Sequence, residues 1–241
     1  MKNQKVDILA FAAHPDDVEL SASGTILKHI EQGKTVAIVD LTRGELGSRG
    51  TLETRKLEAQ EASKIMGISA RVNLGLADGF FEHNEENLLK IVEQIRYFKP
   101  DVVFANAIED RHPDHAKASK LVSDACFLAG LVKVKSFFET YKQEAHRPRL
   151  VLHYIQDRYV KPDLVVDITP FYERKMEAVL AYKTQFFQED QEGPKTPISG
   201  KDFLAFLTGR MTEFGRAIGV SYAEGFTAER TIGVDDLTSI L

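Results

Sequence analysis

The chain has 241 residues, of which 43% are hydrophobic, and this is enough apolar sequence for one domain of the larger α/β kind. Its net charge of -5 argues against a nucleic-acid partner, because neutralising a phosphate backbone usually requires a basic face. The single cysteine, Cys126, excludes a disulfide within the chain and fits a reducing compartment. The N-terminal apolar run "ILAFAA" is too short to span a membrane, so we expect a cytoplasmic protein without a membrane partner.

Continuous apolar runs at residues 6–13 and 35–42 predict two strands that are covered on both faces. Between them, residues 18–33 have apolar positions at helical spacing and end at a glycine, which predicts a helix. Further segments continue this alternation: helices over 52–67, 84–98 and 114–130, and strands over 71–76 and 101–106. The pattern predicts a Rossmann-like, doubly wound, mostly parallel sheet with helices on both faces, in three layers.

After about residue 135 the alternation becomes less regular. Strands are expected over 149–156 and 164–169, followed by helices over 171–187 and 201–219. The polar segment 188–200 between these helices carries two prolines and two glycines, so we expect a mobile surface loop that covers part of a site. We expect residues 1–241 to form a single domain.

The tripeptide His-Pro-Asp occurs twice, in "AHPDD" at residues 13–17 and in "RHPDH" at residues 111–115. Each copy follows a predicted strand, the first and the fourth. In a doubly wound sheet of order 3-2-1-4 these strands are neighbours, and ligands bind beyond their carboxyl ends. Pro15 restricts His14 to an extended conformation, so the imidazole is expected to project from the edge of the sheet. We therefore expect the two stretches to meet in one site.

Two imidazoles and one carboxylate, with coordination positions left open, suit a catalytic zinc ion. His14, Asp17 and His115 are the predicted ligands. Asp16 is the predicted general base, because a carboxylate beside the metal can take the proton of an activated water.

His112 is the predicted general acid for the leaving amine, with the Asp114 carboxylate orienting its ring. A simpler interpretation makes the aspartates helix caps and the histidines solvated residues. That interpretation could account for either stretch alone, but it does not explain why the same tripeptide follows both strands.

At these motifs the sequence resembles the LmbE-like, or PIG-L, family of zinc-dependent N-acetylglucosamine deacetylases. The segments "TRKLEA", "GPKTPISG" and "GVSYAEGF" are similar to the bacillithiol-biosynthesis branch of that family. The resemblance implies one zinc or other divalent ion per chain and hydrolysis of N-acetylglucosaminyl malate or a related N-acetyl sugar or amide. It implies the same roles for the six residues of the two motifs, and a homo-oligomer, with a hexamer among the expected assemblies.

An anionic malate group suggests arginines near the pocket, because a guanidinium recognises a carboxylate through two parallel hydrogen bonds. Arg55, Arg111 and Arg147 are the predicted substrate-binding residues. Arg55 could instead be a solvated helix residue, and Arg111 could pair with Asp110. Some members of the family place a tyrosine from a mobile segment over the site, but residues 188–203 contain none, so the oxyanion donor beyond the metal stays open. His153 is left as either a core residue or a pocket residue.

Several rival functions share parts of this pattern. Two histidines and one carboxylate also hold iron in non-haem oxygenases, although the additional Asp16 favours hydrolysis. A nucleotide-binding module is disfavoured, because no G-x-G-x-x-G follows the first strand and two aspartates would repel a pyrophosphate. A non-catalytic metal protein and a relative that cleaves thiol conjugates or chitin fragments both remain alternatives.

Overall fold

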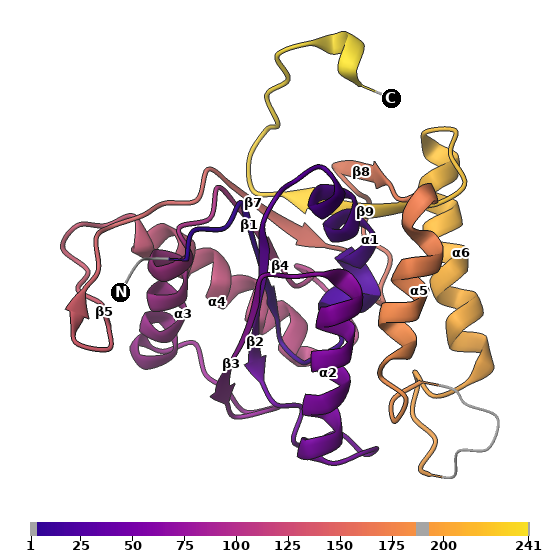
Figure 1. Cartoon of the computed structure of the whole chain (residues 1–241), viewed down its shortest axis with the longest axis horizontal. Coiled ribbons are helices and arrows are strands. Elements are labelled where there is room, and N and C mark those ends of the chain that lie inside the picture. The colour runs from indigo at the N-terminus through magenta and orange to yellow at the C-terminus, as the bar shows by residue number, and fades with distance from the viewer. Residues whose placement is uncertain (1–3, 187–192, 241) are drawn as a thin grey trace.

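The computed structural model describes residues 4–186 and 193–240, and its centre is a seven-stranded sheet of order β3-β2-β1-β4-β7-β9-β8 (Figure 1). Five strands run parallel: β1 (Ile8–Ala12), β2 (Val36–Thr42), β3 (Ala70–Leu76), β4 (Val102–Ala105) and β7 (Leu150–Tyr154). β9 (Ala223–Ala228) lies antiparallel between β7 and β8 (Leu164–Asp167). The predicted order 3-2-1-4 is therefore confirmed, whereas β9 had not been predicted.

Helices cover both faces of the sheet (Figure 1). On one face lie α3 (Glu85–Phe98) and α4 (Pro113–Ala129), packed over alternate residues of β1 and β2. On the other face lie α1 (Asp17–Glu31), α2 (Leu52–Met66) and α5 (Tyr172–Leu180), with α6 (Lys201–Ala217) against β9. Every residue of β1 and β2 is buried, which explains why their sequences are mostly apolar rather than alternating, with Asp40 and Thr42 as buried polar residues of β2.

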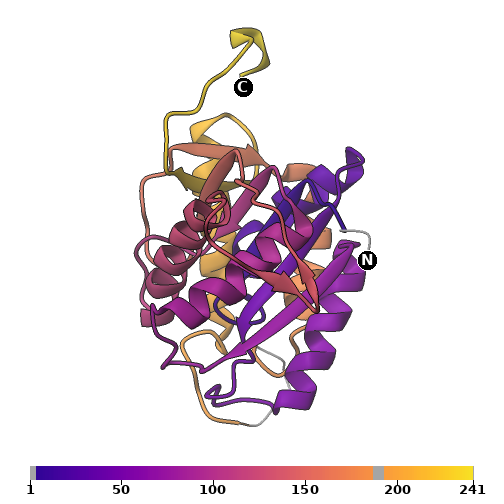
Figure 2. The ribbon, with the colours of Figure 1, turned by 90° about the vertical axis from the view of Figure 1, so that its left-hand side faces the viewer.

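Several expected boundaries changed. The helix predicted over 171–187 begins as a short 3-10 turn at Thr169–Phe171 and ends as α5 at Leu180, and residue 187 lies outside the described residues. A small hairpin of β5 (Phe137–Phe138) and β6 (Tyr141–Lys142) fills part of the connection after α4. Beyond β9 the chain leaves the body and ends near a 3-10 turn at Leu237–Ser239 (Figure 2).

The segment expected as a mobile loop falls partly outside the described residues, which omit 187–192. Residues 193–200 form turns and bends without a helix or strand, and three of them, Thr196, Pro197 and Ile198, line the cavity described below. Because these three residues line the cavity, the segment lies over part of the site, as expected. Its mobility stays a prediction. Within the described residues, no helix is both long and apolar enough to cross a membrane.

A buried ion pair between α5 and β9 holds α1 against β9. Glu224 of β9 accepts hydrogen bonds from the backbone N–H groups of Gly24 (2.9 Å) and Thr25 (2.7 Å). Lys175 of α5 donates to Glu224 at 2.7 Å and to the carbonyl oxygen of Leu20, also at 2.7 Å. Because both charged side chains are excluded from water, each depends on the other for compensation.

Candidate metal centre

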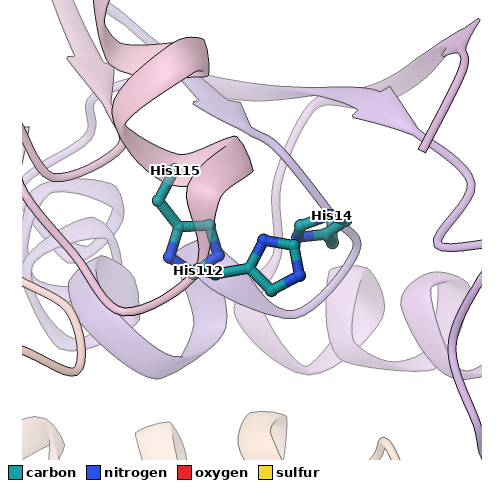
Figure 3. Close-up of side chains that lie close together, drawn as sticks. All are labelled: His14, His112 and His115. Atoms are coloured by element: carbon teal, nitrogen blue, oxygen red, sulfur yellow. The ribbon is translucent and has the colours of Figure 1, made fainter. Parts of the chain in front are cut away.

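The two His-Pro-Asp stretches converge at the carboxyl ends of β1 and β4. Figure 3 shows His14, from the loop after β1, beside His112 and His115, which belong to the start of α4. The ring centroids of His14 and His112 lie 4.6 Å apart, and those of His14 and His115 lie 5.6 Å apart. One nitrogen of each ring lies within 4.8 Å of the others, so the three imidazoles can reach one ion. The expectation that the two stretches meet is confirmed.

The Asp17 carboxylate lies between the two predicted histidine ligands. Its Oδ1 is 3.1 Å from His115 Nε2, and its Oδ2 is 3.7 Å from His14 Nδ1. Asn106, which follows β4, donates to Oδ2 at 3.0 Å, and Gln156, which follows β7, donates to Oδ1 at 3.1 Å. Burial alone would raise the pKa of Asp17, but the charge and hydrogen bond of His115 hold it well below its usual value. Asp17 is therefore an ionised ligand candidate in a fixed orientation.

In His14 and His115, the two predicted histidine ligands, the ring nitrogen that faces away from Asp17 lies beside another carboxylate. His14 Nε2 lies 3.1 Å from Asp78 Oδ1 and 3.4 Å from Asp114 Oδ2. His115 Nδ1 lies 2.5 Å from Asp110 Oδ2. Burial lowers the pKa of both rings, yet these carboxylates raise the pKa of His14 to about 10 and, together with Asp17, that of His115 to about 9. A carboxylate behind each imidazole is the arrangement that orients histidine ligands toward a metal, so this donor set fits zinc.

Asp16, the predicted base, is 5% exposed and adopts φ 127°, a conformation that costs a non-glycine residue energy and that surrounding contacts must hold. Arg55 supplies such contacts: its Nη1 donates to Asp16 Oδ2 at 2.8 Å and to the carbonyl oxygen of Pro15 at 2.7 Å. Burial raises the pKa of Asp16 to about 7, although the Arg55 charge opposes the shift. The solvated interpretation of Arg55 is wrong, because this side chain is buried against the first His-Pro-Asp stretch.

The expected contact between His112 and the Asp114 carboxylate is not formed. The carboxylate instead lies beside His14, pairs with Lys117 at 2.6 Å and accepts from the Gly79 N–H at 2.7 Å. His112 caps α4, and its Nδ1 accepts the backbone N–H of Asp114 at 3.3 Å. Burial lowers the pKa of His112, and because Nδ1 accepts this hydrogen bond, the neutral form of the ring carries its proton on Nε2. Asp114 thus orients His112 through the main chain rather than through its side chain.

These groups open into one cavity with a volume of about 350 Å³. Its polar end contains the metal centre. Apolar side chains of α6 form another wall: Phe203, Phe206, Leu207, Met211 and Phe214. A cavity of this size, apolar with a few convergent polar groups, is typical of a small-molecule site.

The other two predicted substrate arginines behave differently from each other. Arg111 lines the cavity but pairs with Asp157 rather than with Asp110, which is occupied by His115. Arg147 does not line the cavity: its guanidinium stacks on the Phe127 ring, 4.4 Å from the centroid, at the far end of α4. Phe127 lies twelve positions after His115 in this helix, which is roughly 18 Å along the helix axis. The prediction for Arg147 is therefore wrong.

Sequence reasoning missed the supporting shell of this site. Asp78, Asp110, Asn106 and Gln156 all contact predicted ligands, and all follow strands that end at the same edge of the sheet. Polar residues just after strands are the signal that would have found them. His153 belongs to the core, since its Nδ1 lies 2.9 Å from the carbonyl oxygen of Asn106 and it does not line the cavity.

Comparisons with known proteins agree with this geometry. A family model described as PIG-L, GlcNAc-PI de-N-acetylase, matches residues 9–126. The crystal structure of the conserved protein TT1542 from Thermus thermophilus has 37% sequence identity and a TM-score of 0.84, over 95% of this chain and 98% of that one. The uncharacterized deacetylase YaiS of Escherichia coli is 30% identical over 130 residues, covering 52% of this chain and 70% of the relative.

Two further relatives carry substrate names. The diacetylchitobiose deacetylase of Thermococcus kodakarensis is 28% identical over 233 residues, covering 92% of this chain and 83% of the relative. A probable N-acetyl-alpha-D-glucosaminyl L-malate deacetylase 2 of Bacillus anthracis is 25% identical over 202 residues, covering 77% and 84%. The similarity to these deacetylases extends well past the two metal-centre motifs.

Proposed function

The chain belongs to the PIG-L family of metal-dependent deacetylases, and from this premise we propose that it hydrolyses the N-acetyl group of an N-acetylglucosaminide. The observation that carries the proposal is the meeting of His14, Asp17 and His115 at one end of a cavity beside the buried Asp16. Hydrolysis of an amide needs a polarised carbonyl, an activated water and a proton for the amine, and this site offers a group for each.

We assign His14, Asp17 and His115 as the ligands of a zinc ion; other divalent ions suit the same donors. Asp17 is preferred over His112 as the third ligand, because its two oxygens face a nitrogen of each of the other two residues. When bound, zinc would polarise the amide carbonyl and lower the pKa of water at the site.

Asp16 serves as the base in this proposal. Its carboxylate takes a proton from the attacking water as the new C–O bond forms, and it returns that proton to the nitrogen as the C–N bond breaks. Acetate and a free amine are the products. Arg55 keeps the carboxylate in place through the 2.8 Å contact.

The geometry favours a hydrogen-bonding role for His112. Because Nδ1 accepts the Asp114 N–H, the remaining Nε2–H can donate to the amide oxygen as negative charge develops there. A role as the predicted acid would require both ring nitrogens to carry protons, and Nδ1 would then lose this contact. His112 thereby supplies a candidate for the oxyanion donor that the sequence left open.

N-acetylglucosaminyl malate, the substrate of bacillithiol biosynthesis, is our specific proposal for the substrate. It is supported by the branch motifs and by the name of the Bacillus anthracis relative. A related N-acetyl sugar or thiol-conjugate amidase is the alternative. We also predict a homo-oligomer, which a molar mass from light scattering tests. The predicted cytoplasmic location is tested by cell fractionation.

The deciding experiment combines metal analysis of the purified protein with amine release from N-acetylglucosaminyl malate and from N-acetylglucosamine. We expect one zinc per chain, acetate release without oxygen, loss of activity with a chelator and recovery with zinc. Faster turnover of the malate compound supports the bacillithiol assignment. Absence of amine from both sugars would refute the proposed activity, and a requirement for oxygen would indicate an iron enzyme instead.

A further inference from the structure

Among the described residues, three arginines and no lysine line the cavity: Arg55, Arg111 and Arg210. The first two are each neutralised by a carboxylate, Arg55 by Asp16 and Arg111 by Asp157. Arg210, from the middle of α6, has no carboxylate within ion-pair distance in the described part of the chain. Glu213, Asp157 and Asp110 are near enough to favour its charged form, but among the described residues none of them pairs directly with Arg210.

The Arg210 guanidinium is held in a fixed place by main-chain oxygens. Nη1 donates to the carbonyl oxygen of Gln156 at 2.9 Å and, at 3.4 Å, to that of Arg158, while Nη2 donates to that of Asp157 at 2.9 Å. Gln156 also holds Asp17 through its side chain, at 3.1 Å. The same short segment after β7 thus positions both the guanidinium and a predicted metal ligand.

Aromatic rings lie over the faces of this guanidinium. The distances from Arg210 Cζ to the ring centroids are 5.2 Å for Phe206, 5.6 Å for Tyr159 and 5.9 Å for Phe214. Such rings reduce access of water and strengthen any charge interaction made at the edge of the group. The guanidinium carries five N–H donors. Within the described residues its hydrogen bonds leave Nε–H unused, and Nη2 makes one hydrogen bond of the two it can donate, so the group can still donate to an oxyanion.

We propose that Arg210 binds an anionic oxygen group, a carboxylate or a phosphate, on the aglycone of the N-acetylglucosaminide. This inference rests on the proposed function and assigns the residue that recognises a charged aglycone. The cavity holds the reacting acetamide at the metal centre, and Arg210 selects glycosides whose other end is charged. Arg55 and Arg111 are less suited to this role, because the charge of each is already offset by a directly paired carboxylate.

The test compares three N-acetylglucosaminides that differ only in the aglycone: a carboxymethyl, a phosphoethyl and a neutral methyl glycoside. Amine release gives kcat and KM for wild type, Arg210→Gln, Arg210→Lys and the control Arg216→Gln, which removes an exposed charge from the same helix. For Arg210→Gln we expect the ratio of kcat/KM on an anionic substrate to that on the methyl glycoside to fall about 10- to 100-fold, mainly through KM. Arg210→Lys should retain part of this ratio, and Arg216→Gln all of it.

A fall confined to the carboxylate substrate identifies a carboxylate ligand, and a fall confined to the phosphate substrate identifies a phosphate ligand. An unchanged ratio in an active Arg210→Gln enzyme overturns the inference and leaves the proposed deacetylation intact. Wild type that releases no amine from any of the three glycosides refutes the proposed function itself. The ratio is insensitive to general damage to the fold, because such damage lowers kcat/KM on all three substrates by the same factor.

Discussion

Replacing Asp16 by asparagine removes the proposed base while keeping a side chain of the same shape. Because Asn Oδ1 can still accept from Arg55 Nη1, and the Pro15 carbonyl oxygen accepts from the same nitrogen, the arginine keeps its hydrogen bonds. Loss of the charged partner should cost about 1–3 kcal/mol of unfolding free energy, or about 2–12 °C in Tm for a chain of this size. Turnover should fall by about 10²- to 10⁴-fold, which is roughly 2.7–5.5 kcal/mol of barrier.

The assay measures kcat by amine release, zinc per chain by mass spectrometry and Tm by calorimetry. Zinc content should not change, because Asp16 is outside the proposed ligand set. Asp40→Asn is the matched control: it breaks a buried pair with Arg71, at 2.7 Å, away from the cavity. It should lower Tm by a similar amount and turnover far less. Full activity in Asp16→Asn would refute the base, and loss of zinc along with activity would make Asp16 a ligand.

Three other predictions follow from buried contacts. Asp110→Ala removes the carboxylate behind His115 and should weaken zinc affinity about 10- to 100-fold, measured by chelator competition; unchanged affinity would show that this contact does not support the ligand. Lys175→Met leaves Glu224 buried without its partner and should lower the unfolding free energy by about 3–5 kcal/mol in denaturant titration. Burial raises the pKa of Cys126, so its thiol should resist alkylation in the native protein and react only after unfolding; rapid native labelling would contradict this burial.

The strands that could be predicted are those whose own sequence reports burial on both faces. β1 is wholly apolar and β2 nearly so, and the alternation of helices and strands predicted a doubly wound sheet, whose common order 3-2-1-4 the first four strands adopt. β9, with the sequence Ala-Glu-Gly-Phe-Thr-Ala, lacks that signal. It becomes a strand because β7 and β8 pair with it on either side, and Gly225 admits the Phe214 ring where a Cβ would lie 2.8 Å from it.

The site could be predicted only as far as its residues are close in sequence. "AHPDD" and "RHPDH" identified the groups that converge, because each motif holds several of them on one turn. Which carboxylate faces which imidazole depends on side-chain directions set by four separate loops. The motifs therefore did not predict that Asp78, which follows β3, lies beside His14. They also did not predict that the Asp114 carboxylate lies beside His14 rather than His112.

The bracing of α1 by Glu224 joins parts of the chain that are made at very different times. Two hundred residues separate Gly24 from the carboxylate that accepts its N–H. Contacts of such long sequence separation form slowly, because a large loop must close before they are gained. We therefore expect α1 to reach its full stability only after β9 has paired in the sheet. A fragment that lacks β9 should therefore hold α1, and the aspartates at its start, less firmly than the whole chain does.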